Sequence, residues 1–134
     1  PAAIDYRDWH VPLGRRFRAL KLWFVLRSYG AENLRTFIRS HVAWAEALES
    51  KVINDSRLEL TAPRTLALVC FRHIDGNHAT RELADAINAS GSAYVTPSVT
   101  NDVAYIRVSI GSTWTEQRHV EDLWDLIDSN AGLK

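Results

Sequence analysis

The chain has 134 residues, of which 46% are apolar and 24% charged, and its formal net charge is zero. This length suits one compact domain with its own core, and no apolar run reaches the roughly 20 residues that a membrane span needs. The single cysteine, Cys70, excludes an internal disulfide framework and a thiolate metal cluster, so we expect a cytoplasmic protein without membrane contact.

Charge is distributed unevenly along the chain. Residues 1–57 carry ten Lys/Arg against six Asp/Glu, whereas residues 58–134 carry six against ten. The positive excess concentrates between Arg15 and Lys21. A nucleic-acid-binding protein would show a broader basic face, so no nucleic acid is expected as a partner.

The first predicted helix covers about 13–29. Apolar residues recur at spacings of four, three and four, and further apolar residues widen this face until the helix is apolar nearly all round. Such a helix must be buried from several sides. Since it is oversized for this domain, we expect it to bridge to a part of the protein outside the chain. Gly30 is expected to end it.

A second helix is predicted over about 32–54, with His41 on its apolar face as a hydrogen-bonded core histidine. The remaining elements follow from alternating apolar residues, short apolar runs and turn residues. They are strands at 58–62 and 66–71, a helix at 78–89 capped by Asn77, strands at 93–96 and 103–110 joined by a hairpin at Asn101-Asp102, and a last helix that begins near 113–115 with a Thr113–Glu116 capping box. The predicted class is α+β: a small, mainly antiparallel sheet covered on one face by helices.

Most catalytic motifs are missing from the sequence. The five histidines are scattered without metal-ligand spacing, so no metal is expected, and there is no phosphate-binding glycine loop and no nucleophile elbow. His73 and His78 flank the predicted turn at Asp75-Gly76-Asn77 and are expected to be solvated.

One segment, residues 5–23, is unusual. Four cations, Arg15, Arg16, Arg18 and Lys21, lie at a helix start, where the helix dipole disfavours positive charge. Two explanations are open for how these charges are neutralised. The cations either form ordinary ion pairs at a domain or subunit interface, with Asp5 and Asp8 as local candidates, or bind an anion at the helix terminus. Gly14 is either a turn glycine or a position where a ligand or another backbone approaches closely.

The run Asp-Tyr-Arg-x-Trp-x-Val-Pro-Leu-Gly-Arg-Arg-Phe-Arg-x-Leu-Lys-Leu-Trp-Phe-Val-Leu-Arg-x-Tyr-Gly over residues 5–30 closely resembles the group II pyridoxal-phosphate (PLP) dependent decarboxylases, specifically the aromatic-L-amino-acid decarboxylases. The resemblance continues more loosely through Leu68–Arg72 and Tyr105–Ser109. It implies the C-terminal portion of an aspartate-aminotransferase-like fold. Residues 1–20 would end the large PLP-binding domain, and residues 21–134 would form the small C-terminal domain.

The resemblance also implies a function. The complete enzyme would be a homodimer that converts tryptophan, DOPA, tyrosine or phenylalanine to the amine and CO₂, with PLP held by a lysine upstream of this chain. The chain would be a C-terminal fragment, inactive alone, with the N-terminal portion of the same enzyme as its partner and no catalytic or cofactor-binding residue of its own. Leu13 and Gly14 would line the substrate-ring end of the pocket, and the pocket-edge or structural cations would be Arg7, Arg15, Arg16 and Arg18.

Two alternatives remain open at the level of sequence. One is a freestanding, non-catalytic α+β binding or interaction domain, although such a module should not need a helix that is apolar nearly all round. The other is an aromatic aldehyde synthase of the same PLP family, a choice attributed to a catalytic loop upstream of this chain.

Overall fold

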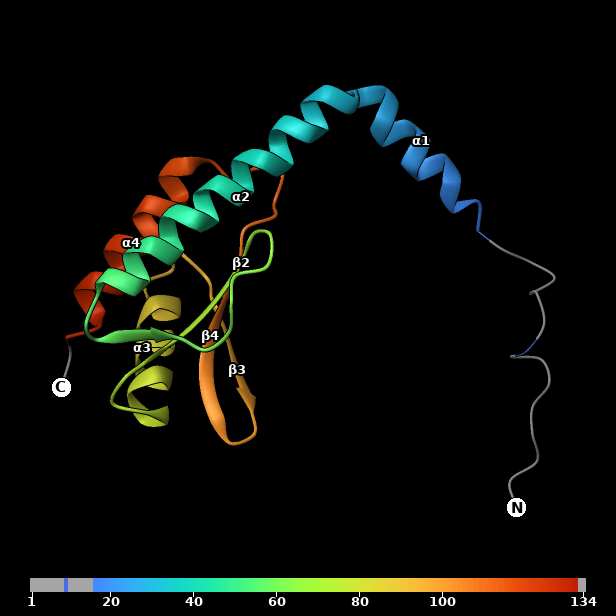
Figure 1. Ribbon diagram of the computed structural model, residues 1–134. Helices are drawn as coiled ribbons and strands as arrows, with labels where there is room; N and C mark the ends of the chain where they lie inside the picture. Colours follow the sequence, from blue (N-terminus) through green and yellow to red (C-terminus); the bar gives the residue numbers. More distant parts are fainter. Residues whose placement is uncertain (1–8, 10–15, 133–134) are drawn as a thin grey trace, which may run out of the picture. The chain divides into compact units, whose positions relative to one another are not determined.

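The computed structural model describes Trp9 and residues 16–132 (Figure 1). The elements occur in the order α1 (Arg18–Tyr29), α2 (Ala31–Asn54), β1 (Leu58–Leu60), β2 (Leu68–His73), α3 (Asn77–Ala89), β3 (Thr96–Thr100), β4 (Val103–Ser109) and α4 (Gln117–Asn130). The predicted order of helices and strands is therefore confirmed, and so is the α+β class.

The sheet has four strands in the order β1-β2-β4-β3, and every neighbouring pair is antiparallel. The β3–β4 hairpin closes through Asn101 and Asp102, whose φ values of 50° and 62° are both left-handed. A two-residue hairpin turn of this kind needs two positive φ values, which Asn and Asp tolerate better than most residues. The predicted hairpin is confirmed.

One face of the sheet forms the core. Alternate residues of β2 and β4 are buried, and the fully buried pair Phe71 and Ile106 lies in register across the two strands. Apolar residues of α2, α3 and α4 complete the same cluster, among them Leu48, Ile87 and Ile127. Three helices thus cover one face, as predicted for a sheet with period-2 alternation.

The first helix differs from its prediction in length and in burial. It begins at Arg18, and residues 13–15 lie outside the described part of the chain. None of its residues is buried, although an apolar helix was expected to be covered on several sides. The chain divides into two compact units, 1–35 and 36–134, each considered by itself below. The domain boundary expected at residues 20 and 21 stays a prediction.

Four local predictions were wrong for reasons of tertiary contact, namely the limits of the third strand, the cap of the last helix, the exposure of His73 and the role of Asn77. The third strand runs over Thr96–Thr100 rather than 93–96, because the turn at 101–102 sets its register on β4 and Val95 is instead bonded to Asn88. The last helix is capped by Glu116, whose backbone N–H donates to Nδ1 of His119, and not by Thr113.

His73 is buried rather than solvated. Its Nε2 lies 2.9 Å from the carbonyl oxygen of Ala131, and its Nδ1 accepts the backbone N–H of Asp75 at 3.1 Å. The ring therefore ties the end of β2 to the end of α4. The side chain of His78, in contrast, is 86% exposed, as expected.

Asn77 was expected to cap α3 but lies inside the helix as its first residue. Its Oδ1 accepts the backbone N–H of Ala104 at 2.8 Å, and its Nδ2 donates to the carbonyl oxygen of Asp102 at 2.6 Å. The amide side chain thus fastens the start of α3 to the β3–β4 hairpin, which is a contact between segments about 25 residues apart in sequence.

We predict that Asn77→Ala lowers the free energy of unfolding by about 1–3 kcal/mol, since a partly buried backbone N–H loses its acceptor. Urea unfolding followed by circular dichroism measures the change. Asn54→Ala is the matched control, because its side chain donates only within its own helix, to the carbonyl oxygen of Ser50. Equal losses in the two variants would contradict the bridging role.

Candidate functional site

The predicted site residues fall mostly on the undescribed segment. Arg7, Leu13, Gly14 and Arg15 lie outside the described residues. Arg16 and Arg18 are described and exposed, and Arg18 is the first residue of α1. Their predicted roles at the pocket edge stay predictions.

The start of α1 carries positive charge that no described residue compensates. Its first turn has no acidic residue. Neither Arg18 nor Lys21 makes an ion pair with any other described residue. Positive charge at a helix N-terminus is unfavourable, so an anionic group is expected to approach this end.

The rest of α1 presents a large apolar surface. Trp23 and Phe24 contact each other edge to face at 5.1 Å between ring centroids, and the Arg27 guanidinium lies 5.9 Å from the Trp23 ring. Seven of the large apolar side chains are between 42% and 61% exposed, namely Leu20, Leu22, Trp23, Phe24, Val25, Leu26 and Tyr29. Contiguous apolar exposure on this scale is typical of surfaces that contact another polypeptide, a membrane or a ligand.

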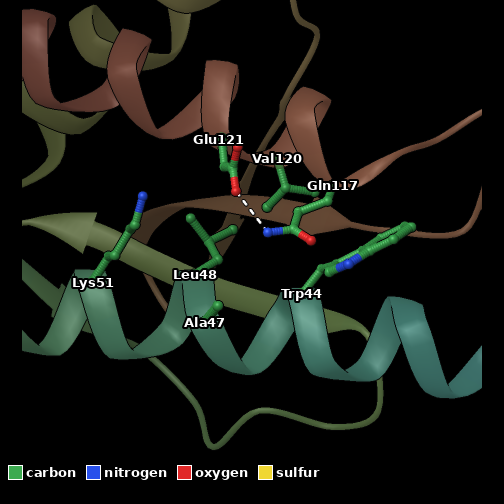
Figure 2. Close-up of a pocket in the computed structure, with 7 residues that line it drawn as sticks. All are labelled: Trp44, Ala47, Leu48, Lys51, Gln117, Val120 and Glu121. Atoms are coloured by element: carbon green, nitrogen blue, oxygen red, sulfur yellow. Dashed lines mark hydrogen bonds between the residues drawn. The ribbon is translucent and has the colours of Figure 1, made fainter.

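Within the unit 36–134, a small pocket opens between α2 and α4 (Figure 2). Its volume is about 80 Å³, and its apolar floor is made by Leu48 and Val120. At its rim, Nε2 of Gln117 donates to Oε1 of Glu121 at 2.7 Å. Lys51 closes one side, with its ammonium 5.5 Å from the Trp124 ring centroid. The sequence pattern did not indicate this pocket, because nothing in it pairs α2 with α4.

The chain is similar to known proteins over nearly its whole length. A family model described as the pyridoxal-dependent decarboxylase conserved domain matches residues 2–74. Tryptophan decarboxylase 2 of Oryza sativa subsp. japonica is 41% identical over 97% of this chain. Tyrosine/DOPA decarboxylase 1 of Papaver somniferum is 43% identical over 95% of it. The chain belongs to the pyridoxal-dependent decarboxylase family.

Solved structures agree with this assignment. The crystal structure of Oryza sativa tryptophan decarboxylase with PLP and tryptamine matches 95% of the chain with a TM-score of 0.82 at 40% identity. This match confirms the expected fold. The chain spans 29% of that structure and 28% of each of the two curated relatives. It therefore corresponds to a minor part of a pyridoxal-dependent decarboxylase.

PLP is the cofactor of this family, which confirms the predicted cofactor, but the α2–α4 pocket does not fit it. The α2–α4 pocket, at about 80 Å³, is smaller than the roughly 150 Å³ cavity that takes a benzene molecule. A substituted pyridine ring with a phosphate cannot enter it. Of the three lysines, Lys21 and Lys51 are exposed and Lys134 lies outside the described part.

The part of the chain that the structure describes contains neither a candidate metal site nor a candidate membrane-spanning helix. No group of three metal-ligating side chains occurs there. No helix there has the length and apolar character needed to cross a bilayer.

Among the described residues, the buried side chain of His41 has a ring nitrogen without a hydrogen-bond partner. It is 4% exposed between the rings of Phe37 and Trp44, and its Nε2 has no hydrogen-bond partner. Burial lowers the pKa of His41 below 6.5, and a backbone hydrogen bond with Thr115 partly opposes the shift. The predicted core position is right, but Nε2 lacks the hydrogen bond expected of a core histidine.

We predict that His41→Leu becomes more stable than the parent chain as the pH falls from 7.5 to 5.5. Because the pKa of folded His41 is lowered, the unfolded chain takes up a proton first, near pH 6.5, and unfolding is favoured below that pH. The leucine variant lacks this dependence. Urea midpoints at the two pH values measure the difference. The exposed His78→Leu control should follow the parent, and a His41→Leu effect independent of pH would contradict the prediction.

Proposed function

We propose that this chain is the C-terminal part of a PLP-dependent decarboxylase that converts an L-aromatic amino acid to its amine and CO₂. The similarity to tryptophan and tyrosine/DOPA decarboxylases over at least 95% of the chain carries the proposal. The proposed substrates are tryptophan, DOPA, tyrosine or phenylalanine, and the proposed assembly is a cytoplasmic homodimer.

The exposed helix α1 supports the view that this part works inside a larger enzyme. A freestanding binding domain is not expected to carry a helix that has no buried residue and exposes apolar side chains on most of its sides. The upstream portion of the same enzyme is the proposed cover for that surface. A carboxylate or phosphate there would also compensate Arg18 and Lys21.

The chemistry belongs to the cofactor. PLP supplies the electron sink that accepts the electron pair left when CO₂ departs. None of the described residues is assigned a bond-making step, and we place the cofactor's lysine upstream. The chain alone is then inactive.

Substrate contact is proposed for the segment before α1. Leu13 and Gly14 would border the aromatic ring, where glycine leaves room for an indole or phenol. Arg7, Arg15, Arg16 and Arg18 would act as structural or pocket-edge cations.

An aldehyde product is the second candidate. Phenylacetaldehyde synthase of Arabidopsis thaliana is 42% identical over 96% of this chain. The crystal structure of Rhodiola rosea 4-hydroxyphenylacetaldehyde synthase matches 96% of it with a TM-score of 0.82. Both outcomes keep the PLP fold and the aromatic substrate, so the product must be measured.

We predict that the full-length polypeptide carrying this chain binds PLP and releases CO₂ from aromatic amino acids, whereas the 134-residue chain does neither. Visible absorbance reports the bound cofactor, and chromatography of the products distinguishes amine from aldehyde. PLP absorbance in the isolated chain, or a full-length protein inert toward all four substrates, would overturn the proposal.

We further predict that Gly14→Val in the full-length polypeptide lowers kcat/KM for tryptophan by roughly 10- to 200-fold, because added methyl groups occupy space that the larger ring needs. The loss for phenylalanine should be smaller. Gly132→Val is the matched control, since a Cβ atom there makes only an ordinary contact, at 3.7 Å, with Nη1 of Arg57. Equal losses for both substrates would argue against a role at the ring end.

A further inference from the structure

A second pocket of the unit 36–134 is lined by residues of α3, β3 and β4. Its volume is about 160 Å³, which is twice that of the α2–α4 pocket and close to the roughly 150 Å³ cavity that takes a benzene molecule. The apolar residues Pro97, Val99 and Ala104 contribute to its lining. The space therefore suits one aromatic ring or a branched chain of similar size.

Arg81 of α3 brings a positive charge to this pocket. Of the described residues that line it, Arg81 alone is charged. It is exposed and forms no ion pair with any other described residue, although Asp85 lies one turn further along α3. A guanidinium presents its N–H donors in one plane and pairs with a carboxylate through two parallel hydrogen bonds. The pocket thus has a group suited to hold a carboxylate.

The free edge of β3 adds a backbone donor beside the pocket. In an antiparallel pair, hydrogen-bonded and non-hydrogen-bonded residue pairs alternate, and the two-residue turn makes Thr100 and Val103 a hydrogen-bonded pair. The next pair, Val99 and Ala104, therefore directs its backbone groups outward, in agreement with the hydrogen bond from the Ala104 N–H to Asn77. Because β3 is the last strand of the sheet (Figure 1), the Val99 N–H points to the open edge.

The lining also limits which ligand can bind. None of the described lining residues is acidic, so the ammonium group of an amino acid or an amine would find no carboxylate there. A further β-strand is disfavoured at this edge because Pro97 has no N–H to donate to it. A ligand with one carboxylate, one apolar ring and no amino group meets these conditions.

The α2–α4 pocket offers no comparable site. It has half the volume, and its charged groups already have partners. Glu121 accepts a hydrogen bond from Gln117, and the Lys51 ammonium lies against the Trp124 ring. A ligand there would have to displace these contacts, whereas Arg81 needs only to lose water.

We propose that the pocket between α3, β3 and β4 binds a small aromatic carboxylate without an amino group. Arg81 holds the carboxylate, the Val99 N–H is available as a second donor, and Pro97 and Ala104 contact the ring. Binding there makes and breaks no covalent bond. The site goes beyond the proposed function, since neither an amino acid substrate nor an amine product meets its charge requirement.

The test uses benzoate and the full-length polypeptide with ¹³C-labelled alanine and valine methyl groups. The methyl signals of Val99 and Ala104 report on the pocket itself, so benzoate bound elsewhere in the enzyme does not interfere. Val99→Ile identifies the Val99 signals by their absence. We expect saturable shifts with a Kd on the order of 1–10 mM, as is usual for a ligand of this size.

Arg81→Gln should weaken benzoate binding by about tenfold or more, because a charge-assisted pair is lost. Arg118→Gln is the matched control, since Arg118 is also an exposed arginine but lies on α4 outside the pocket lining. Benzylamine has the same ring with a positive charge, and phenylalanine carries both charges. Both ligands should bind more weakly than benzoate.

Four outcomes decide the proposal. Saturable shifts with benzoate that Arg81→Gln weakens and Arg118→Gln retains support it. Absence of a saturable shift overturns it, and so does equal benzoate binding by Arg81→Gln and the parent. Benzylamine that binds as tightly as benzoate also overturns it, because the carboxylate would then not be recognised. Decarboxylation and aldehyde formation are assayed separately, so failure of the proposed function is distinguishable from failure of this site.

Discussion

Burial of one sheet face beneath three helices is the constraint on which the rest of this unit depends. Phe71 and Ile106 are fully buried neighbours on β2 and β4, and burying such side chains contributes roughly 1.5–3 kcal/mol each. Side chains along a strand alternate between the two faces of the sheet. The neighbouring pair Cys70 and Arg107 therefore lies on the face opposite Phe71 and Ile106. Burial also raises the pKa of the Cys70 thiol, which disfavours the reactive thiolate.

The polar contacts at one end of the unit lock this arrangement. His73 and Arg57 both reach the last turn of α4, and Asn77 reaches the hairpin. Arg57 keeps the pKa of Asp55 below its usual value, chiefly through their hydrogen bond, so the pair stays ionised at neutral pH. The opposite end of the unit is fastened as well, since Nε of Arg64 donates to Glu49 of α2 at 2.7 Å. The loops there also expose large apolar side chains, namely Leu66, Tyr94 and Trp114.

Helix α1 exposes large apolar side chains on most of its sides. Contiguous apolar surface of this kind is typical of a region that contacts another polypeptide or another part of the same protein. The chain belongs to the pyridoxal-dependent decarboxylase family and spans 28% of each of two curated relatives. Its influence on the reaction is proposed to act through the segment that carries Leu13 and Gly14.

Local pattern alone determined the helices, the antiparallel sheet, the Asn101-Asp102 hairpin and the family, whose motif lies in residues 5–30. These features depend on periodicity, on backbone preferences of single residues or on contiguous sequence. The limits of β3, the Glu116 cap, the burial of His73 and the partners of Asn77 were decided only by tertiary structure. Each of them depends on strand register or on a partner far along the chain: Ala131 lies 58 residues from His73, and Ala104 lies 27 residues from Asn77. The α2–α4 pocket was hidden for the same reason, since a sequence pattern does not state which two helices pack side by side.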